Sequence, residues 1–249
     1  MSNVSLRWVV ALGSEANGII SKYKLKQVTD DNLYRIYKDK SELNWLIISG
    51  IGQVNAAAAT MHLFHVSKAP KWACWINIGI AGSGIGELGE VFLIDKITQK
   101  SSGRSSYPAV IINDSIFRAG LLTVDKPTTE YLGQDLIDME AYAFVQVASK
   151  LSCRELILVL KIVSDGKNDD IKNLTKQKVS QLIIDKLDTL ENLIEKLKTL
   201  SSLEFERLAL PHAYGEIIKR HHFSASQLHQ LLPLVKRWAA VNPSEDLLE

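Results

Sequence analysis

The chain has 249 residues, of which 46% are hydrophobic and 23% charged, so it can bury a sizeable core and lacks the composition of a disordered or fibrous protein. Its 29 Lys and Arg residues balance 28 Asp and Glu residues, and a formal charge of +1 excludes a general attraction to nucleic acid or an anionic membrane. No apolar run approaches the roughly 20 residues that span a bilayer, and no secretory signal is recognised, so we expect a cytoplasmic protein.

The first sixty residues repeat a pattern of strand, turn and helix. The apolar run 6–12 predicts a strand that ends at Gly13-Ser14-Glu15, where a helix can begin. A second apolar run, 43–49, leads through Gly50-Ile51-Gly52 into residues 54–59, whose alanines favour helix.

The middle of the chain predicts further strands. The run 72–80 predicts a strand that enters the glycine-rich stretch 79–86, and a second strand follows at 91–94. Residues 100–108 are polar and rich in serine, which is typical of a loop. One more short strand is predicted within 116–124.

The last part of the chain changes character twice. Residues 138–148 have helical spacing, and the run 156–163 predicts a strand that ends in a polar turn at Ser164-Asp165-Gly166. Apolar positions across 179–200 predict one amphipathic helix. Beyond it we expect a separate helical extension, 201–249, with a helix at about 224–240.

Strands that alternate with helices predict an α/β domain at 1–200, with a central mixed β-sheet flanked by helices in three layers. In open sheets of this kind, ligands bind beyond the carboxyl ends of the strands. The predicted turns at Glu15, Gly50, Gly79 and Asp165 all fall at such ends. We therefore expect a pocket there.

Three patterns in the sequence could suggest a cofactor, a metal site or a disulfide, and none of them is adopted. Residues 84–89 spell G-x-G-x-x-G, but a strand rather than a helix follows, so no helix N-terminus is available for a dinucleotide. His62 and His65 are three apart on a predicted helix without a matching carboxylate or cysteine. Cys74 and Cys153 lie in apolar runs and form no CxxC pair. We expect no metal and no cofactor.

Three carboxylates stand out at the edges of apolar elements. Glu15 and Asp165 each follow a strand, and Glu140 begins a helix of small residues. A carboxylate near a buried strand end must be hydrogen-bonded, so such residues are caps, buried partners or catalytic groups. Taken alone, each is explained equally well as a helix cap or first-turn charge.

Five short motifs, three of which contain these carboxylates, occur in order along the chain: Ala11-Leu12-Gly13-Ser14-Glu15-Ala16, Ser49-Gly50-Ile51-Gly52-Gln53-Val54-Asn55-Ala56-Ala57, Asn77-Ile78-Gly79-Ile80-Ala81-Gly82, Asp138-Met139-Glu140 and Ser164-Asp165-Gly166. This is the order found in the nucleoside phosphorylase and nucleosidase family. Across about residues 6–200 the chain resembles the methylthioadenosine/S-adenosylhomocysteine nucleosidase branch of that family.

The resemblance implies a homodimeric enzyme that hydrolyses the N-glycosidic bond of a purine nucleoside, with Glu15 activating water and Asp165 protonating the base. Paired carboxylates suit this chemistry because cleavage develops positive charge on the sugar and negative charge on the base. Met139 and Glu140 would contact the sugar, and Ser164 would orient Asp165. Four further residues complete the implied binding site: Gly52, Gly79, Ile80 and Val124.

Departures from the family pattern keep alternatives open. The chain lacks the phosphorylases' arginines near Gly13 and Asn77, which favours hydrolysis over phosphorolysis. Ile80 replaces a serine or threonine, and the segment 95–114 is too short for the family's loop over the substrate. A phosphorylase, a non-catalytic nucleoside-binding module and a futalosine-like substrate are the alternatives.

Overall fold

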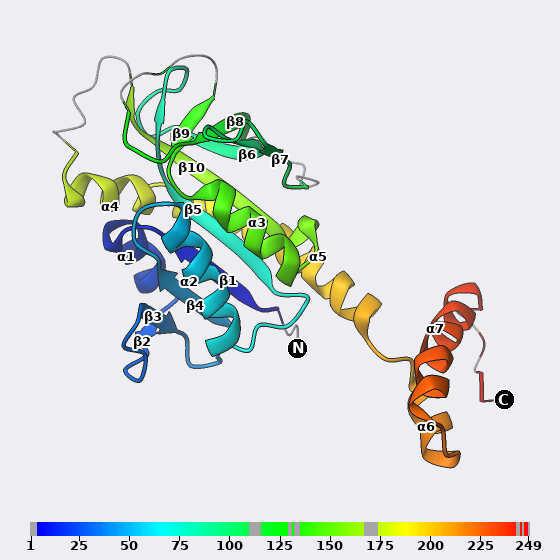
Figure 1. Ribbon diagram of the computed structural model, residues 1–249. Helices are drawn as coiled ribbons and strands as arrows, with labels where there is room; N and C mark the ends of the chain where they lie inside the picture. The colour runs from blue at the N-terminus through cyan, green and yellow to red at the C-terminus, as the bar shows by residue number, and fades with distance from the viewer. Residues whose placement is uncertain are drawn as a thin grey trace. The chain divides into compact units, whose positions relative to one another are not determined.

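The computed structural model describes residues 4–109, 116–128, 131, 135–166, 174–242, 245 and 247–248. The chain divides into two compact units, Met1–Leu203 and Glu204–Glu249, which are treated separately below (Figure 1). Among the described helices, none combines the length and hydrophobicity needed to cross a membrane.

The centre of the first unit is formed by parallel strands. The strand β1 (Leu6–Val10) lies between β4 (Asn44–Ile48) and β5 (Cys74–Ser83), and β10 (Ile157–Gly166) pairs with β5 on its other side. All five residues of β1 and nine of the ten in β10 are buried. Continuous apolar runs of this kind are typical of strands covered on both faces.

Five strands close into a ring. From β5 the pairing runs through β10, β6 (Val91–Gln99), β8 (Phe117–Thr123) and β9 (Leu136–Asp138), and β9 pairs again with β5. The remaining strands are β3 (Arg35–Lys38) and β2 (Lys26–Gln27), which extend the sheet beyond β4, and β7 (Ser105–Ser106), which pairs with β6. Three pairs of the ring are parallel (β5 with β10, β6 with β8, β8 with β9) and two are antiparallel (β10 with β6, β9 with β5), which confirms the predicted mixed sheet.

Helices cover both faces of the sheet, as Figure 1 shows. One core cluster joins the sheet to α1 (Gly13–Lys22), α4 (Lys176–Ile184) and α5 (Leu187–Leu208), and a second joins it to α2 (Gln53–Val66) and α3 (Ala141–Leu151). The short 3₁₀ helix η1 (Arg154–Leu156) precedes β10. The expected three-layer α/β architecture is confirmed.

Two expectations about local structure are wrong. The helix predicted across 179–200 is two helices, since the chain turns at Asp185 between α4 and α5. The turn lets Ile184 and Leu187 both pack against Gly18 of α1. The predicted turns at Gly79 and Ser164-Asp165 lie inside β5 and β10. These strands stay paired up to Ser83 and Gly166, and a β-bulge accommodates Ser164.

The second unit is helical, with α6 (His212–Arg220) and α7 (Ala225–Val241) following the end of α5. Ser224 caps α7, and its side chain and that of Gln227 form a capping box. The Lys236 ammonium donates to the Leu208 carbonyl (3.5 Å), and Ala213 and Val235 are buried. The predicted helical segment at the C-terminal end is therefore present.

Candidate active site

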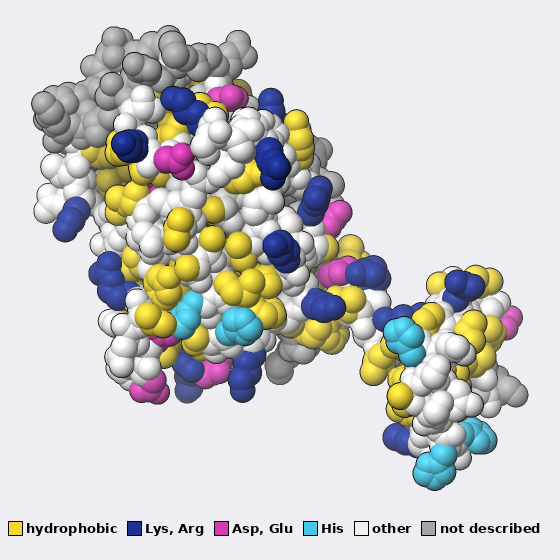
Figure 2. Space-filling view, in the orientation of Figure 1, with side chains coloured by type: hydrophobic (Ala, Val, Ile, Leu, Met, Phe, Trp, Pro, Cys, Tyr) yellow, Lys and Arg dark blue, Asp and Glu magenta, His cyan; other side chains and the backbone are white. Residues whose placement is uncertain are grey.

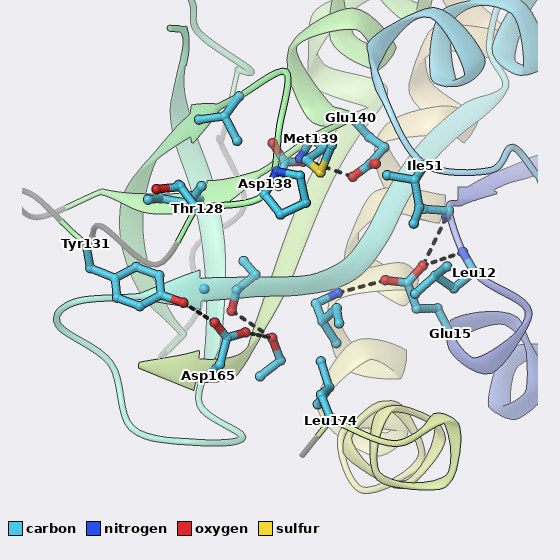
Figure 3. A pocket seen from close by; sticks show the side chains of 18 residues that line it. Leu12, Glu15, Ile51, Thr128, Tyr131, Asp138, Met139, Glu140, Asp165 and Leu174 are labelled. Atoms are coloured by element: carbon cyan, nitrogen blue, oxygen red, sulfur yellow. Dashed lines mark hydrogen bonds between the residues drawn. The ribbon is translucent and has the colours of Figure 1, made fainter. Parts of the chain in front are cut away.

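A cavity of about 250 Å³ lies where β1, β5, β9 and β10 end (Figure 3). Seven residues expected at a binding site from the sequence line it: Glu15, Ile80, Val124, Met139, Glu140, Ser164 and Asp165. The other lining residues are Ala11, Leu12, Ile51, Ala81, Gly82, Pro127, Thr128, Tyr131, Ile137, Asp138 and Leu174. Gly52 and Gly79 do not line the cavity, although each touches a carboxylate that does.

Glu15 is held by backbone donors from two elements. Its Oε2 accepts hydrogen bonds from the N–H groups of Ala11 (3.0 Å) and Leu12 (2.8 Å), and its Oε1 accepts one from the N–H of Ile80 (2.9 Å). Burial raises the pKa of the Glu15 carboxyl, against the opposing effect of these donors and of Lys161. A carboxylate has about four acceptor positions, so one is left for a ligand.

Gly79 makes room for this carboxylate. A Cβ atom at residue 79 would lie 2.7 Å from Oε1 of Glu15, closer than two such atoms can approach. The glycine is therefore required by the close approach of Glu15 to β5.

Glu140 lies at the N-terminus of α3 and faces the turn before α2. Its Oε1 accepts a hydrogen bond from the N–H of Gly52 (2.7 Å), whose φ of 102° is in the region that favours glycine. Burial and the neighbouring charge of Asp138 raise the pKa of Glu140 to about 7, although Lys161 acts in the opposite direction. Glu140 therefore changes charge close to neutral pH.

Asp165 is surrounded by hydroxyl groups. The Ser164 hydroxyl donates to its Oδ1, and the Tyr131 hydroxyl donates to its Oδ2. A Cβ at residue 82 would lie 2.5 Å from the Tyr131 ring, so Gly82 allows the tyrosine to reach Asp165. Figure 3 shows Tyr131 and Asp165 at one end of the cavity and Glu15 at the other.

Sequence reasoning missed Tyr131 and Lys161. Tyr131 is in a part of the chain without local periodicity, so no pattern indicated it. Lys161 is fully buried in β10, and its ammonium lies 2.9 Å from Oδ2 of Asp138. A single lysine inside the apolar run 157–163 was a usable signal, because a buried charge requires a partner.

The described residues contain no cluster of three or more His, Cys, Asp or Glu side chains that could hold a metal ion. His62 of α2 contacts Asp31 instead. Residues 84–89 form the connection from β5 to β6, so a strand follows them, as expected from the sequence. Residues 110–114 of the shortened segment lie outside the described residues.

Solved structures with a similar fold include nucleosidases. An Arabidopsis thaliana 5′-methylthioadenosine nucleosidase matches with a TM-score of 0.64 and 18% identity, over 78% of this chain and 96% of that one. The chain has the nucleosidase fold. A 5′-methylthioadenosine/S-adenosylhomocysteine nucleosidase of Helicobacter pylori matches with a TM-score of 0.62 and 13% identity, over 78% of this chain and 98% of that one.

The futalosine hydrolase of Helicobacter pylori has the same fold, with a TM-score of 0.63 and 12% identity over 78% of this chain and 98% of that one. No protein-family model and no curated protein matches the sequence. At these identities the likeness establishes the fold, and the activity must be argued from the cavity itself.

Proposed function

We propose that this protein hydrolyses the N-glycosidic bond of a purine nucleoside or a related metabolite, such as methylthioadenosine or S-adenosylhomocysteine, and releases the free base. The observation that carries the proposal is the placement of Glu15 and Asp165 at opposite ends of one cavity. Glu15 contacts β5 at Ile80 and Asp165 pairs with β5 at Gly82, so the two residues meet this strand at positions two residues, or about 7 Å, apart. Two carboxyl groups at opposite ends of a cavity can act on a substrate bound between them, one as base and the other as acid.

In the proposed reaction, water attacks the anomeric carbon as the bond to the base breaks. Glu15 takes a proton from the water, and the electron pair of the broken bond moves to the base, which receives a proton through Asp165. A raised pKa suits Glu15 for this role, because a general base acts best when its pKa is near the working pH. Glu140, when ionised, accepts hydrogen bonds from the ribose hydroxyls.

The remaining predicted residues support these groups. Met139 packs against the sugar, while Ile80 and Val124 provide apolar walls. Ser164 orients Asp165 through its hydroxyl. Gly52 and Gly79 act through Glu140 and Glu15, which they respectively bind and accommodate.

The lining favours water over phosphate as the nucleophile. Among the described residues that line the cavity there is no Lys, Arg or His, so a phosphate dianion would be buried without a countercharge. One observation favours the phosphorylase alternative, because the Arg35 guanidinium would lie 3.5 Å from a Cβ on Gly13, next to the first turn of α1. Arg35 itself does not line the cavity.

The test is base release from a panel of purine nucleosides, including methylthioadenosine, S-adenosylhomocysteine and a futalosine-like compound, in phosphate-free buffer. We expect free base and free sugar, with no dependence on added phosphate. Ribose 1-phosphate formed only with phosphate present would establish a phosphorylase instead. Nucleosides that raise the melting temperature without being cleaved would indicate a non-catalytic binding module. An unchanged rate in Asp165→Asn or Glu140→Gln would refute the site assignment.

We further propose that the protein is a cytoplasmic homodimer. Figure 2 shows hydrophobic side chains gathered around histidines on the face of the first unit that it draws. In α2, Val54 is 83% exposed, and Ile51, which precedes this helix and lines the cavity, is 53% exposed. Light scattering should give a dimer mass that Val54→Asp reduces. A monomeric wild-type protein would contradict the proposal.

A further inference from the structure

A buried lysine lies beneath the candidate active site. Lys161 is in the middle of β10, where it pairs with Gly79 of β5 and Phe92 of β6, and it is 2% exposed. Transfer of an ammonium group from water to such a position costs several kcal/mol unless it is paired and hydrogen-bonded. Its ammonium lies 2.9 Å from Oδ2 of Asp138, which lines the cavity.

Asp138 links this lysine to the turn that carries Met139 and Glu140. Its Oδ1 accepts a hydrogen bond from the Thr123 hydroxyl (2.7 Å). Its Oδ2 accepts one from the Ala141 N–H (2.8 Å), besides the contact with Lys161. The carboxylate thus connects β8, β10 and the first turn of α3. Its position therefore determines the position of Glu140, the residue at which that helix begins.

The positive charge of Lys161 also acts beyond Asp138. The acidic groups that interact with it come from three elements: Asp138 of β9, Glu140 at the start of α3 and Glu15 of α1. Burial acts to lower the pKa of Lys161, but these carboxylates outweigh it, so the pKa is raised and the lysine stays charged. Lys161 in turn acts to lower the pKa of Glu15 and of Glu140.

We propose that Lys161 is a positioning residue of the nucleosidase site: through Asp138 it fixes the turn that carries Glu140, and its charge allows Glu15 and Glu140 to be ionised together in a buried cavity. The inference rests on the proposed function for its catalytic meaning. It assigns the lysine no contact with the substrate. Without the cation, two or three carboxylates would share a site of low polarity, and at least one would hold a proton.

The experiment compares two replacements that treat the charge differently. The double variant Lys161→Met/Asp138→Asn removes both members of the buried pair and leaves no unpaired charge, so it avoids the main cause of misfolding in Lys161→Met alone. Lys161→Arg retains the charge. Circular dichroism and melting temperature establish that each variant is folded.

The first readout does not depend on activity. Carboxyl ¹³C signals of labelled glutamate are titrated, with Glu15 and Glu140 assigned by their loss in Glu15→Gln and Glu140→Gln. In the double variant we expect the Glu15 midpoint to move to higher pH, because Lys161 acts on Glu15 whereas Asp138 is not among the main influences on it. Lys161→Arg should keep the wild-type midpoint.

The second readout is the pH profile of kcat/KM for base release. We expect the acid limb of the double variant to move to higher pH, so that at a pH well below the limb kcat/KM falls by about tenfold for each pH unit of displacement. Lys161→Arg, which retains the charge, should have the wild-type pH profile.

A folded double variant with the wild-type titration and profile would overturn the inference and leave Lys161 as a structural partner of Asp138. A shift in Lys161→Arg as large as in the double variant would also overturn it, because charge would then not be the cause. If the wild-type protein cleaves no nucleoside, the proposed function fails, while the ¹³C titration still decides the role of Lys161.

Discussion

At one end of the cavity Glu15 and Glu140 accept hydrogen bonds from backbone N–H groups, whereas at the other end Asp165 accepts them from the hydroxyls of Ser164 and Tyr131. Backbone donors are fixed by the sheet and the helix starts, and they can only donate. A hydroxyl can rotate and can donate or accept. The difference suits a fixed base for water at one end and an exchangeable proton at the other.

The strongest test of the fixed end is Glu15→Gln. The amide removes the base, and one of its two polar atoms is a donor that faces the N–H of Ile80 or those of Ala11 and Leu12. We expect base release to fall by about 10²–10⁴-fold. Stability should fall by about 1–3 kcal/mol. Single-turnover kinetics and urea unfolding measure the two effects, with the exposed Glu155→Gln as control. Retained activity would exclude Glu15 as the base.

Two glycine replacements compare the ends directly. In Gly79→Ala the new Cβ would be 2.7 Å from Oε1 of Glu15, and in Gly82→Ala 2.5 Å from the Tyr131 ring. Because Glu15 is held by three backbone donors, we expect Gly79→Ala to lower kcat/KM by about 10²-fold or more, and overpacking to cost about 1–3 kcal/mol of stability.

Gly82→Ala should lower kcat/KM by less, about tenfold. The Tyr131 ring can shift away from the new Cβ, while Asp165 retains its hydrogen bond from the Ser164 hydroxyl. Gly215→Ala is the control, since a Cβ there meets no atom within 4 Å. Equal losses in the two cavity variants would remove the distinction between a fixed and an adaptable end.

Glu140→Gln should make the protein more stable at alkaline pH. The folded-state pKa of about 7 lies above the ordinary value of 4.5, so the folded protein binds this proton more tightly than the unfolded chain does. The free energy of unfolding therefore falls as pH rises from about 4.5 to about 7. Glutamine removes that loss while its oxygen still accepts from Gly52, and we expect a gain of up to about 3 kcal/mol at pH 8.

Urea unfolding at pH 4 and pH 8 measures this effect, and the exposed Glu87→Gln is the matched control. At pH 4 the Glu140→Gln variant and the wild type should be about equally stable. A gain of the same size at both pH values would show that the ionisation of Glu140 is not its origin.

The smallest effect is expected for Tyr131→Phe. The change removes the donor to Oδ2 of Asp165, but the Ser164 hydroxyl remains and a bound base can take the vacant place. We expect kcat/KM to change by less than about tenfold. Steady-state kinetics across a pH series tests this. A loss as large as that of Glu15→Gln would make Tyr131 a catalytic residue.

Local patterns predicted the fixed end of the cavity better than the adaptable one. Glu15 and Glu140 lie where apolar runs meet helices, and the contacts that hold them follow from the strand order. Tyr131 reaches Asp165 across 34 positions of sequence, and no local spacing encodes such a contact. Lys161 could have been recognised, because a lone cation in a buried strand implies a buried anion.

The break between α4 and α5 could not be read from periodicity. No Gly or Pro separates them, and apolar residues continue at helical spacing on both sides of Asp185. The turn depends on packing against Gly18, more than 160 residues earlier in the chain. Helices and strands could therefore be predicted where the signal lies in neighbouring residues. Helix breaks and side-chain contacts that depend on residues far away in the sequence could not.

The closed ring of β5, β10, β6, β8 and β9 also affects how the protein resists aggregation. A strand with an unpaired side offers backbone groups on which another chain can assemble. Within the described residues, the ring strands pair on both sides. Unpaired sides remain at β2, which consists of the exposed Lys26 and Gln27, at the half of β3 that β2 does not cover, and at the two-residue strand β7. Edges as short as these, one of them with a lysine in it, are poor templates for intermolecular pairing.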